Sequence, residues 1–358
     1  MKKTLIIILI CLLISISIYA CAHVETPQEP AVTTPDPTPV TTPGSTTETT
    51  PQTEPEPEET PEPVITGEHL KIVATIFPQY DWVYQILGDK AEFKDISLVI
   101  NNRIDLHNFQ PSVSDIVNIS SADLFIYIGG ESDDWTEAVL EQAINPDMVV
   151  INLLEALGEN ALINEEIDDG HHHHHHHHDE DFDEHIWLSL RNAVIFVEVI
   201  ASALSTLDPE LSEVYKENAA LLIEQFEKLD NEYKQVVSNA NKDTLLFADR
   251  FPFRYLMHDY DLNFYAAFSG CSAETEASFR TITFLARKID ELGLTSVIIT
   301  ESGNISIAET VINSSTEKNQ QILVLDSMQS SNDFDRQQGI TYLSIMESNL
   351  QVLKEALN

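Results

Sequence analysis

The stretch HNFQPSVSDIVNISSADLFIYIGG, residues 107–130, holds a helix candidate that is followed directly by a buried strand. Residues 111–120 begin with Pro111, which suits the first turn of a helix. Residues 123–129 are a continuous run of apolar, β-branched and aromatic side chains, which predicts a buried strand. The stretch therefore predicts one unit of a fold in which strands and helices alternate.

The same alternation extends on both sides of this stretch. Apolar runs predict seven further strands, at 71–76, 95–100, 148–153, 244–249, 263–268, 295–300 and 321–326, and other patterns predict helices at 79–87, 134–143, 276–292 and 335–357. Residues 190–239 are helical in pattern, with a break at Asp208-Pro209. Four strands, a long helical stretch and four more strands predict an α/β fold of two lobes, each a parallel sheet flanked by helices, joined by a long interlobe helix. Ligands of such folds bind in the cleft beyond the carboxyl ends of the strands.

The segment 276–292 has the clearest helical periodicity in the chain. Phe279, Ile282, Leu285 and Ile289 recur on one stripe, and Gly293 follows the last turn. We expect an amphipathic helix whose buried face is this stripe.

The chain opens with a short apolar segment behind two lysines. Lys2 and Lys3 precede an apolar run at 5–18, and the small residue Ala20 comes directly before Cys21. The pattern is typical of a lipoprotein signal peptide at 1–21, with an ordinary secretory signal or an uncleaved anchor as alternatives. We expect a lipid on Cys21 to hold the protein at the cell membrane, on the extracytoplasmic face.

The segment after the signal has a different composition from the rest of the chain. Residues 22–66 are rich in Pro, Thr and Glu and have almost nothing to bury, which predicts a disordered tether. In polyproline II form it could extend to on the order of 100 Å. Beyond it we expect an N-terminal α/β lobe at 67–188, an interlobe helical segment at 189–241 and a C-terminal α/β lobe at 242–358.

The net charge and the cysteine content limit which partners the protein can bind and whether it can form a disulfide. The chain has 59 acidic against 19 basic residues and a net charge of −40, which argues against binding nucleic acid and favours cations. Of its three cysteines, Cys11 lies in the signal and Cys21 would carry lipid. Only Cys271 is left in the body, so we expect no internal disulfide.

Four histidines of the body lie outside the histidine run. His69 precedes the first predicted strand, and His258 falls in a predicted helix, so we expect both at the surface. His107 follows the second strand, and His185 precedes the interlobe helix. Both lie in loops that can face one cleft. From these residues alone, each is a surface or core histidine or a metal ligand.

Three segments together resemble the ZnuA/TroA-like family, the substrate-binding proteins of zinc and manganese ABC importers. Residues 107–111, HNFQP, followed by SD at 114–115 and SADLFIYIG at 121–129, are similar to the family's first ligand motif. DEHIWLSLRNA at 183–193 is similar to its second ligand motif, and DPELSEVYKENA at 208–219 to its interlobe helix. The resemblance covers about residues 68–358 and implies that His107 and His185 are metal ligands in the cleft.

The third ligand position of the family is changed in this sequence. Aligning Phe253 and Tyr255 with the family's Phe-x-Tyr pair puts Arg250 where a His or Glu is expected. Arginine has no lone pair to offer a metal. The third ligand is therefore lost or comes from elsewhere, for which Asp249 at a strand end and Cys271 are candidates. Cys271 is equally consistent with a small buried side chain.

The fourth position is occupied by a suitable residue. VLDSMQS at 324–330 resembles the family's strand-end Asp motif, which makes Asp326 the candidate ligand. Glu301 in IITES matches a frequent family glutamate that is more often structural than ligating. A helix N-cap is the alternative role for either acid.

A run of histidines precedes the second motif, in a predicted His-rich loop at 168–184. It is internal and is bracketed by acidic residues, so we interpret it as native: His171, His172, His173, His174, His175, His176, His177 and His178. Such a run cannot pack a core but offers many weak, exchanging metal sites. One hypothesis is that it collects or senses zinc near the cleft; the alternative is a solvated loop without effect on uptake.

The resemblance and the residues together favour one function. We expect a lipoprotein, without enzymatic activity and monomeric, that captures Zn²⁺, or Mn²⁺ as an alternative, and passes it to an ABC permease with its ATPase subunit. A metal-dependent surface adhesin is the second hypothesis. An extracellular zinc enzyme is a third, against which the sequence has no helix-borne H-E-x-x-H and no nucleophile elbow.

Overall fold

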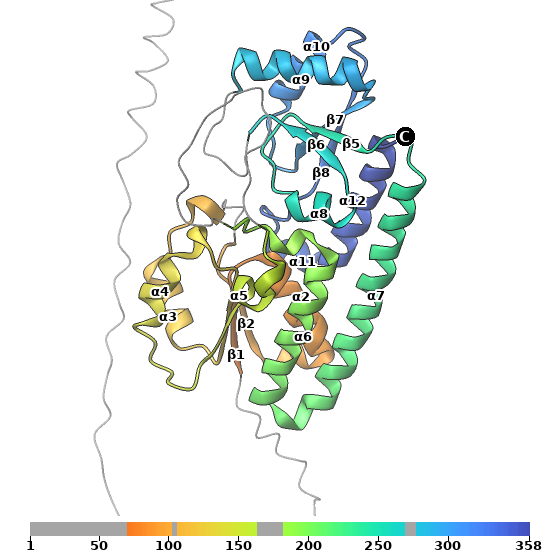
Figure 1. Cartoon of the computed structure of the whole chain (residues 1–358). Helices are drawn as coiled ribbons and strands as arrows, with labels where there is room; N and C mark the ends of the chain where they lie inside the picture. Colours follow the sequence, from red (N-terminus) through yellow and green to blue (C-terminus); the bar gives the residue numbers. More distant parts are fainter. Residues whose placement is uncertain (1–69, 102–105, 163–181, 269–276) are drawn as a thin grey trace, which may run out of the picture. The chain divides into compact units, whose positions relative to one another are not determined.

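The computed structural model of the chain describes residues 70–101, 106–162, 182–268 and 277–358 (Figure 1). All four segments belong to one compact unit, residues 64–358. The expected signal peptide with Cys21, the tether, the histidine run at 171–178 and Cys271 lie outside the described residues.

The described residues form two four-stranded parallel sheets with the same strand order. The first sheet has the order β2-β1-β3-β4 and the second β6-β5-β7-β8. All eight predicted strands are confirmed, each within its expected range. Their bounds are β1 Lys71–Ala74, β2 Asp95–Leu98, β3 Leu124–Tyr127, β4 Val149–Asn152, β5 Thr244–Phe247, β6 Asn263–Ala266, β7 Ser296–Thr300 and β8 Gln321–Leu325.

Helices connect the strands, as parallel sheets require. The α-helices are α2 (Phe77–Leu87), α3 (Val113–Ser120), α4 (Trp135–Leu140), α5 (Leu153–Leu157), α6 (Leu190–Leu207), α7 (Ser212–Ser238), α8 (Arg254–Asp259), α9 (Phe279–Leu292), α10 (Ile305–Ser314), α11 (Asp333–Gln337) and α12 (Tyr342–Ala356). Short 3-10 turns are η1 (Gly88–Phe93), η2 (Leu106–Asn108), η3 (Glu131–Asp133), η4 (Gly158–Asn160), η5 (Ile186–Leu188) and η6 (Pro209–Leu211). The predicted break at Asp208-Pro209 is confirmed, because η6 separates α6 from α7.

The alternation of side chains along β1 and β3 divides the core of the first lobe. Val73 and Phe125 face one side of the sheet, where they pack with residues of α3 and α4. Ile72 and Ile126 face the other side, where α2 and α6 cover the sheet (Figure 1). Both faces are therefore buried, which is why these strands read as continuous apolar runs.

The second sheet is covered in the same way. Leu246 and Ala248 pack with α9 and α10, whereas Leu245 and Phe247 belong to the large core that also contains α7 and α12. That large core includes residues of β1, α2 and α6 as well. One continuous apolar core therefore reaches from the first sheet to the second.

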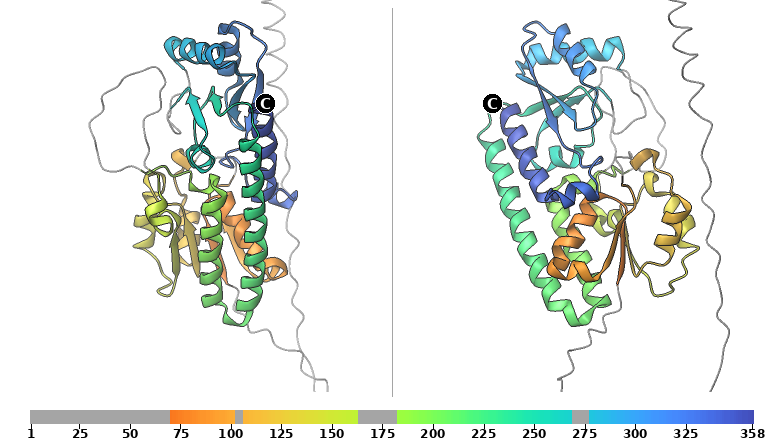
Figure 2. Two further views of the ribbon diagram at one scale, coloured as in Figure 1. Left: turned by 45° about the vertical axis from the view of Figure 1, so that its right-hand side comes forward. Right: turned by 180° about the vertical axis from the view of Figure 1, so that it is seen from behind.

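The last helix, α12, contributes to both lobes. It lies alongside α7, as both views of Figure 2 show, and it contacts α2 and β8. At its first residue, the backbone N–H of Tyr342 donates to the buried carboxylate of Asp81 in α2 at 2.9 Å. An anion at a helix N-terminus satisfies a free amide and complements the helix dipole. The Tyr342 ring packs against Trp82 and Phe226, with centroids 5.1 and 5.2 Å apart.

Several helix boundaries differ from the sequence prediction, and two of them have a clear local cause. The helix expected at 335–357 is interrupted, because Gly339 has a φ of +84° and Thr341 caps a new helix through its side chain. The helix expected at 111–120 begins at Val113. Ser112 is its N-cap and exchanges hydrogen bonds with Asp115, so Pro111 precedes the helix.

The expected buried stripe of 276–292 is partly wrong. Ile289 and Leu285 are buried, but Phe279 is 84% exposed. Phe279 is the first residue of α9, and the buried face passes instead through Thr281, whose hydroxyl contacts the Ser278 side chain. The face that meets the sheet is thus rotated away from the most apolar residue of the first turn.

Candidate metal centre

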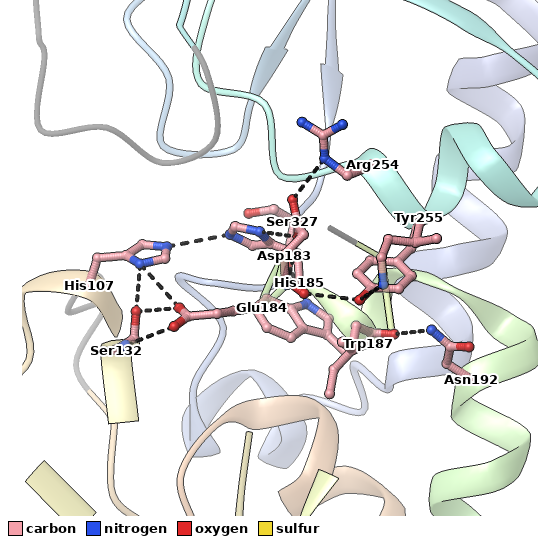
Figure 3. Close-up of polar contacts among 12 residues, drawn as sticks. His107, Ser132, Asp183, Glu184, His185, Trp187, Asn192, Arg254, Tyr255 and Ser327 are labelled. Atoms are coloured by element: carbon pink, nitrogen blue, oxygen red, sulfur yellow. Dashed lines mark hydrogen bonds and ion pairs between the residues drawn. The ribbon is translucent and has the colours of Figure 1, made fainter. Parts of the chain in front are cut away.

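Two histidines that are distant in sequence meet in the structure. His107 lies in η2, between β2 and α3, and His185 lies directly before η5 and α6. Their Nε2 atoms are 3.4 Å apart (Figure 3). Two nitrogen ligands of a tetrahedral zinc, each at about 2.0–2.1 Å, would lie roughly 3.3–3.4 Å apart. The pair is therefore spaced as two ligands of one ion.

A carboxylate fixes the orientation of His185. The Nδ1 atom of His185 is 2.9 Å from Asp183 Oδ1, which also accepts from the backbone N–H of His185. The other carboxylate oxygen of Asp183 lies 3.4 Å from Arg254 Nε. Burial alone would raise the pKa of Asp183, but the charge and hydrogen bonds of His185, with Arg254, hold it below its ordinary value. The ionised carboxylate places the proton of His185 on Nδ1 and leaves Nε2 to a metal.

His107 is oriented through a hydroxyl instead. Its Nδ1 atom lies 2.6 Å from Ser132 Oγ, and this hydroxyl donates to the carboxylate of Glu184. The same carboxylate accepts the backbone N–H of Ser132 at 2.8 Å. Gly130 has a φ of +83°, and a Cβ there would overlap the Glu184 carboxylate. Glycine is thus required at this position for the backbone to approach the carboxylate so closely.

Each of the two imidazoles can offer the lone pair of its Nε2 atom to a cation. When a ring carries its single proton on Nδ1, the lone pair of its Nε2 atom is free to bind a cation placed between the two rings. At this distance a proton or a metal ion between the two nitrogens would be shared by both. Neutral imidazole nitrogens suit borderline divalent ions such as zinc.

The turn beyond His185 is hydrogen-bonded to the second lobe and to α6. The Trp187 Nε1–H donates to the carbonyl of Ser327, which follows β8, at 2.9 Å. The Tyr342 hydroxyl donates to the carbonyl of Trp187 at 2.7 Å, and Asn192 donates to the carbonyl of Ile186. All these groups are buried, so the turn that presents His185 has its polar backbone satisfied within the core.

The strand-end carboxylates of the second lobe are engaged in other hydrogen bonds. Asp249 accepts from the backbone and hydroxyl of Thr300 at 2.8 and 2.7 Å, and Gly303 leaves room for it. Glu301 accepts from Ser327 and Ser330, backbone and hydroxyl alike. In this structure both carboxylates hold neighbouring loops.

Asp326 lies at the end of β8, as the sequence predicts, and is half-buried. One of its carboxylate oxygens accepts from the backbone N–H of Met328 at 2.8 Å. Burial, and then the charge of Glu301, raise the pKa of Asp326 to about 6. Among the residues that the structure describes, no three His, Cys, Asp or Glu side chains gather to hold a metal ion. The structure thus unites His107 and His185 but does not bring Asp326, Asp249 or Glu301 to them.

Several residues that shape the centre were not foreseen. Arg254 contacts Asp183, and the Tyr255 hydroxyl donates to the Asp183 carbonyl at 3.0 Å. Glu184 and Ser132 were missed as well. Glu184 is adjacent to His185, and Ser132 follows the glycine pair after β3, where a parallel strand ends. Ser132 could have been predicted from its place beyond the carboxyl end of a parallel strand, because ligands of such sheets bind there.

The two ends of the segment that holds the histidine run lie together. The backbone N–H of Asp183 donates to the carbonyl of Leu162 at 2.9 Å. The Leu162 N–H in turn donates to the Tyr255 hydroxyl at 3.0 Å. Residues 163–181 therefore leave and rejoin the described fold beside His185.

Comparison with known proteins agrees with this geometry. The family described as "Zinc-uptake complex component A periplasmic", ZnuA, matches residues 72–356. The zinc-binding lipoprotein AdcA of Streptococcus pneumoniae is 30% identical over 288 residues, which are 80% of this chain and 55% of AdcA. The chain thus spans about half the length of that relative. The high-affinity zinc uptake system protein ZnuA of Bacillus subtilis is 28% identical over 81% of this chain and 88% of its own length.

Solved structures show the same fold. The Zn(II)-bound ZnuA-like domain of Streptococcus pneumoniae AdcA superposes with a TM-score of 0.64 at 26% identity, over 81% of this chain and 99% of that domain. The family match over residues 72–356 includes both sheets and both histidine-bearing turns. The chain therefore belongs to the ZnuA family.

Proposed function

We propose that this protein is an extracytoplasmic receptor that captures Zn²⁺ and delivers it to the permease of an ABC importer, which is driven by its ATPase subunit. The observation that supports this most is the His107–His185 pair, whose Nε2 atoms are 3.4 Å apart and whose Nδ1 atoms both face acceptor groups. Family membership and the zinc-binding relatives support the same ion. In this proposal the protein binds and releases its cargo and catalyses no reaction.

We further propose that the coordination of zinc is completed by a residue that is not beside the two histidines in this structure. Asp326 is the first candidate, because its carboxylate is at a strand end and accepts one hydrogen bond, from Met328, among the described residues. Cys271 is the second. Asp249 and Glu301 are weaker candidates because their oxygens already accept several hydrogen bonds. A carboxylate as third ligand would keep Mn²⁺ as an alternative cargo.

The proposed receptor is held at the cell surface by a lipid on Cys21 and acts as a monomer. The segment 22–66 would serve as its tether, and the lobes 67–188 and 242–358 would flank the metal through the helical segment 189–241. The histidine run would supply weak sites that raise the local zinc concentration. Because residues 162 and 183 are hydrogen-bonded to each other, both ends of that loop lie next to His185.

The experiment is a zinc titration of the purified protein against a chromogenic chelator, with metal analysis of the protein as isolated. We expect one tight zinc site in the unmodified protein and its loss in the His107→Ala/His185→Ala variant. The matched control is His258→Ala, since His258 is an exposed histidine of α8 outside the centre. Tight binding that survives removal of both histidines would refute the proposed site.

The remaining ligand is identified by the same titration. Asp326→Ala and Cys271→Ser are compared with Asp249→Asn and Glu301→Gln. We expect Asp326→Ala to weaken zinc binding most. If Asp326→Ala binds as tightly as the unmodified protein while Cys271→Ser does not, the thiolate is the ligand and the assignment of Asp326 is wrong.

A further inference from the structure

We propose that Ser132 and Glu184 form a relay that positions His107 and fixes the proton of its imidazole. The inference rests on the proposed zinc-binding function and assigns roles to two residues that do not themselves contact the ion. In the relay, Glu184 orients the hydroxyl of Ser132, and that hydroxyl orients the imidazole. The metal-facing Nε2 of His107 is thereby kept unprotonated.

The direction of the hydrogen bonds follows from the single proton of the Ser132 hydroxyl. An ionised carboxylate can only accept, so the contact between Ser132 Oγ and Glu184 Oε2 uses the hydroxyl proton. The same oxygen lies 2.6 Å from His107 Nδ1 and must then accept there. His107 therefore carries a proton on Nδ1, and in the neutral ring the lone pair lies on Nε2, which faces His185.

Glu184 is held firmly enough to act in this way. Its side chain is only 9% exposed, and its Oε1 atom accepts the backbone N–H of Ser132 while Oε2 accepts the hydroxyl. The two carboxylate oxygens of Glu184 thus accept from both the backbone N–H and the hydroxyl of Ser132. Gly130, whose missing side chain leaves space for the carboxylate, completes the cradle. Figure 3 shows Glu184 reaching Ser132 from the turn that carries His185.

Neighbouring residues of this turn serve the two imidazoles separately. Asp183 bonds His185 directly, and Glu184 points to the other side and acts on His107 through Ser132. The tripeptide 183–185 therefore contains one of the two proposed ligands, His185, and determines which nitrogen carries the proton in both imidazoles. Partners that orient a metal-ligating histidine are worth about 10–100-fold in metal affinity.

The test compares zinc affinity, by chelator competition, among variants of the whole protein. We expect Ser132→Ala to weaken binding about 10–100-fold, Glu184→Ala to weaken it by a similar factor, and Ser132→Thr, which keeps the hydroxyl, to restore most of the affinity. The matched controls are Ser114→Ala and Glu131→Gln, which change exposed residues close to the centre in sequence. Both should bind zinc as the unmodified protein does.

A second readout separates positioning from a merely structural role. Long-range ¹H–¹⁵N spectra of the zinc-free protein report which ring nitrogen carries the proton. We expect the Nδ1–H form of His107 in the unmodified protein and in Ser132→Thr, and a mixture of both forms in Ser132→Ala. The His185 signals should stay unchanged in these variants, because Asp183 orients that ring.

The outcomes distinguish the relay from the function on which it rests. If Ser132→Ala and Glu184→Ala bind zinc as tightly as the unmodified protein while His107→Ala does not, the relay is wrong and the receptor proposal stands. An unmodified protein without tight zinc binding would refute the receptor itself. Should Glu184→Ala fail to fold, Glu184→Gln and the two Ser132 variants carry the test.

Discussion

The two histidines of the centre occupy unequal surroundings. The side chain of His185 is 4% exposed and that of His107 is 23% exposed. His185 is hydrogen-bonded directly to a buried carboxylate, and the turn after it is hydrogen-bonded to the second lobe and to α6. His107 lies in a short 3-10 turn and reaches its carboxylate through a hydroxyl. One of the two proposed ligands is thus built into the core, and the other lies nearer the surface, where the proposed relay holds it.

This difference indicates how such a centre can bind and still release its ion. A buried histidine whose neighbours already hydrogen-bond to it loses little conformational entropy when the metal binds, because its rotamer is already fixed. A more exposed ligand leaves an access route for water and for exchange. We expect capture to begin at His107 and the final geometry to be dictated by His185.

The largest expected effect is that of His185→Ala compared with His107→Ala. Both should abolish tight zinc binding, but only His185→Ala should also destabilise the metal-free fold, by about 1–3 kcal/mol, because it removes a partner of buried Asp183. His107→Ala should change the free energy of unfolding by less than about 0.5 kcal/mol. Denaturant unfolding of the metal-free variants measures the difference; equal stabilities would remove the distinction between the two histidines.

Asp183→Asn should have the next largest effect. The amide can still accept from His185 but loses the charge that favours the Nδ1–H form and pairs with Arg254, so we expect about 10–100-fold weaker zinc binding. The matched control is Asp208→Asn, which removes a paired carboxylate at the far end of α6. Zinc competition titrations of both variants give the result; a similar loss in both would indicate a general effect of charge.

Trp187→Phe tests whether the hydrogen bond from Trp187 to Ser327, which joins the turn after His185 to the second lobe, stabilises the fold. The substitution leaves the buried carbonyl of Ser327 without its indole donor, so we expect a loss of about 1–3 kcal/mol in stability. Trp82→Phe is the control, because Trp82 is equally buried and its Nε1 has no hydrogen-bond partner among the described residues. If denaturant unfolding gives both variants the same stability, the bond to Ser327 is not important.

Asp133→Asn tests the turn on the His107 side. The buried Asp133 carboxylate accepts from the N–H groups of Ile128 and Gly129, and burial raises its pKa from 3.8 to about 6. Because the folded-state pKa is above the unfolded value, ionisation destabilises the fold as the pH rises from about 4 to 6. The asparagine variant should therefore unfold at higher denaturant concentration than the unmodified protein at pH 7, and the advantage should vanish near pH 4. An advantage that grew towards acid pH would contradict this assignment.

Removing the histidine run should have the smallest effect on the centre. Replacing residues 171–178 by serine at constant length leaves the hydrogen bond between residues 162 and 183 in place. We expect an unchanged affinity of the tight site and fewer weakly bound ions, measured by equilibrium dialysis and metal analysis. If neither the number of bound ions nor growth under zinc starvation changes, the reservoir hypothesis is wrong.

Local patterns predicted the fold well where burial is two-sided. All eight strands follow from their apolar runs, and the signal is clearest for β1, β3, β5 and β7, whose residues are almost all buried. The errors lie mostly at helix ends, which fray and whose exact position depends on local capping. Phe279 was assigned to a buried face but lies in the exposed first turn of α9, and Gly339 divides a helix that periodicity alone would continue.

The centre was predicted only in part. His107 and His185 were named from the motifs around them, and the structure brings their Nε2 atoms to 3.4 Å. Their partners were missed, because Ser132 and Arg254 are distant from the histidines in sequence and have no motif of their own. The assignment of Asp326 stays a prediction, since its carboxylate does not join the pair in this structure.

The sequence by itself determined the eight strands, the break before Pro209 and the two histidines, since each depends on neighbouring residues, on periodicity or on a motif. The tertiary structure alone decided that Glu184 serves His107 while Asp183 serves His185, and that Asp249 and Glu301 bind their own loops. Hydrogen bonds extend only about 3 Å and depend on direction. Which acceptor a side chain finds is therefore fixed by how the loops at the strand ends pack, and no local pattern in the chain encodes that packing.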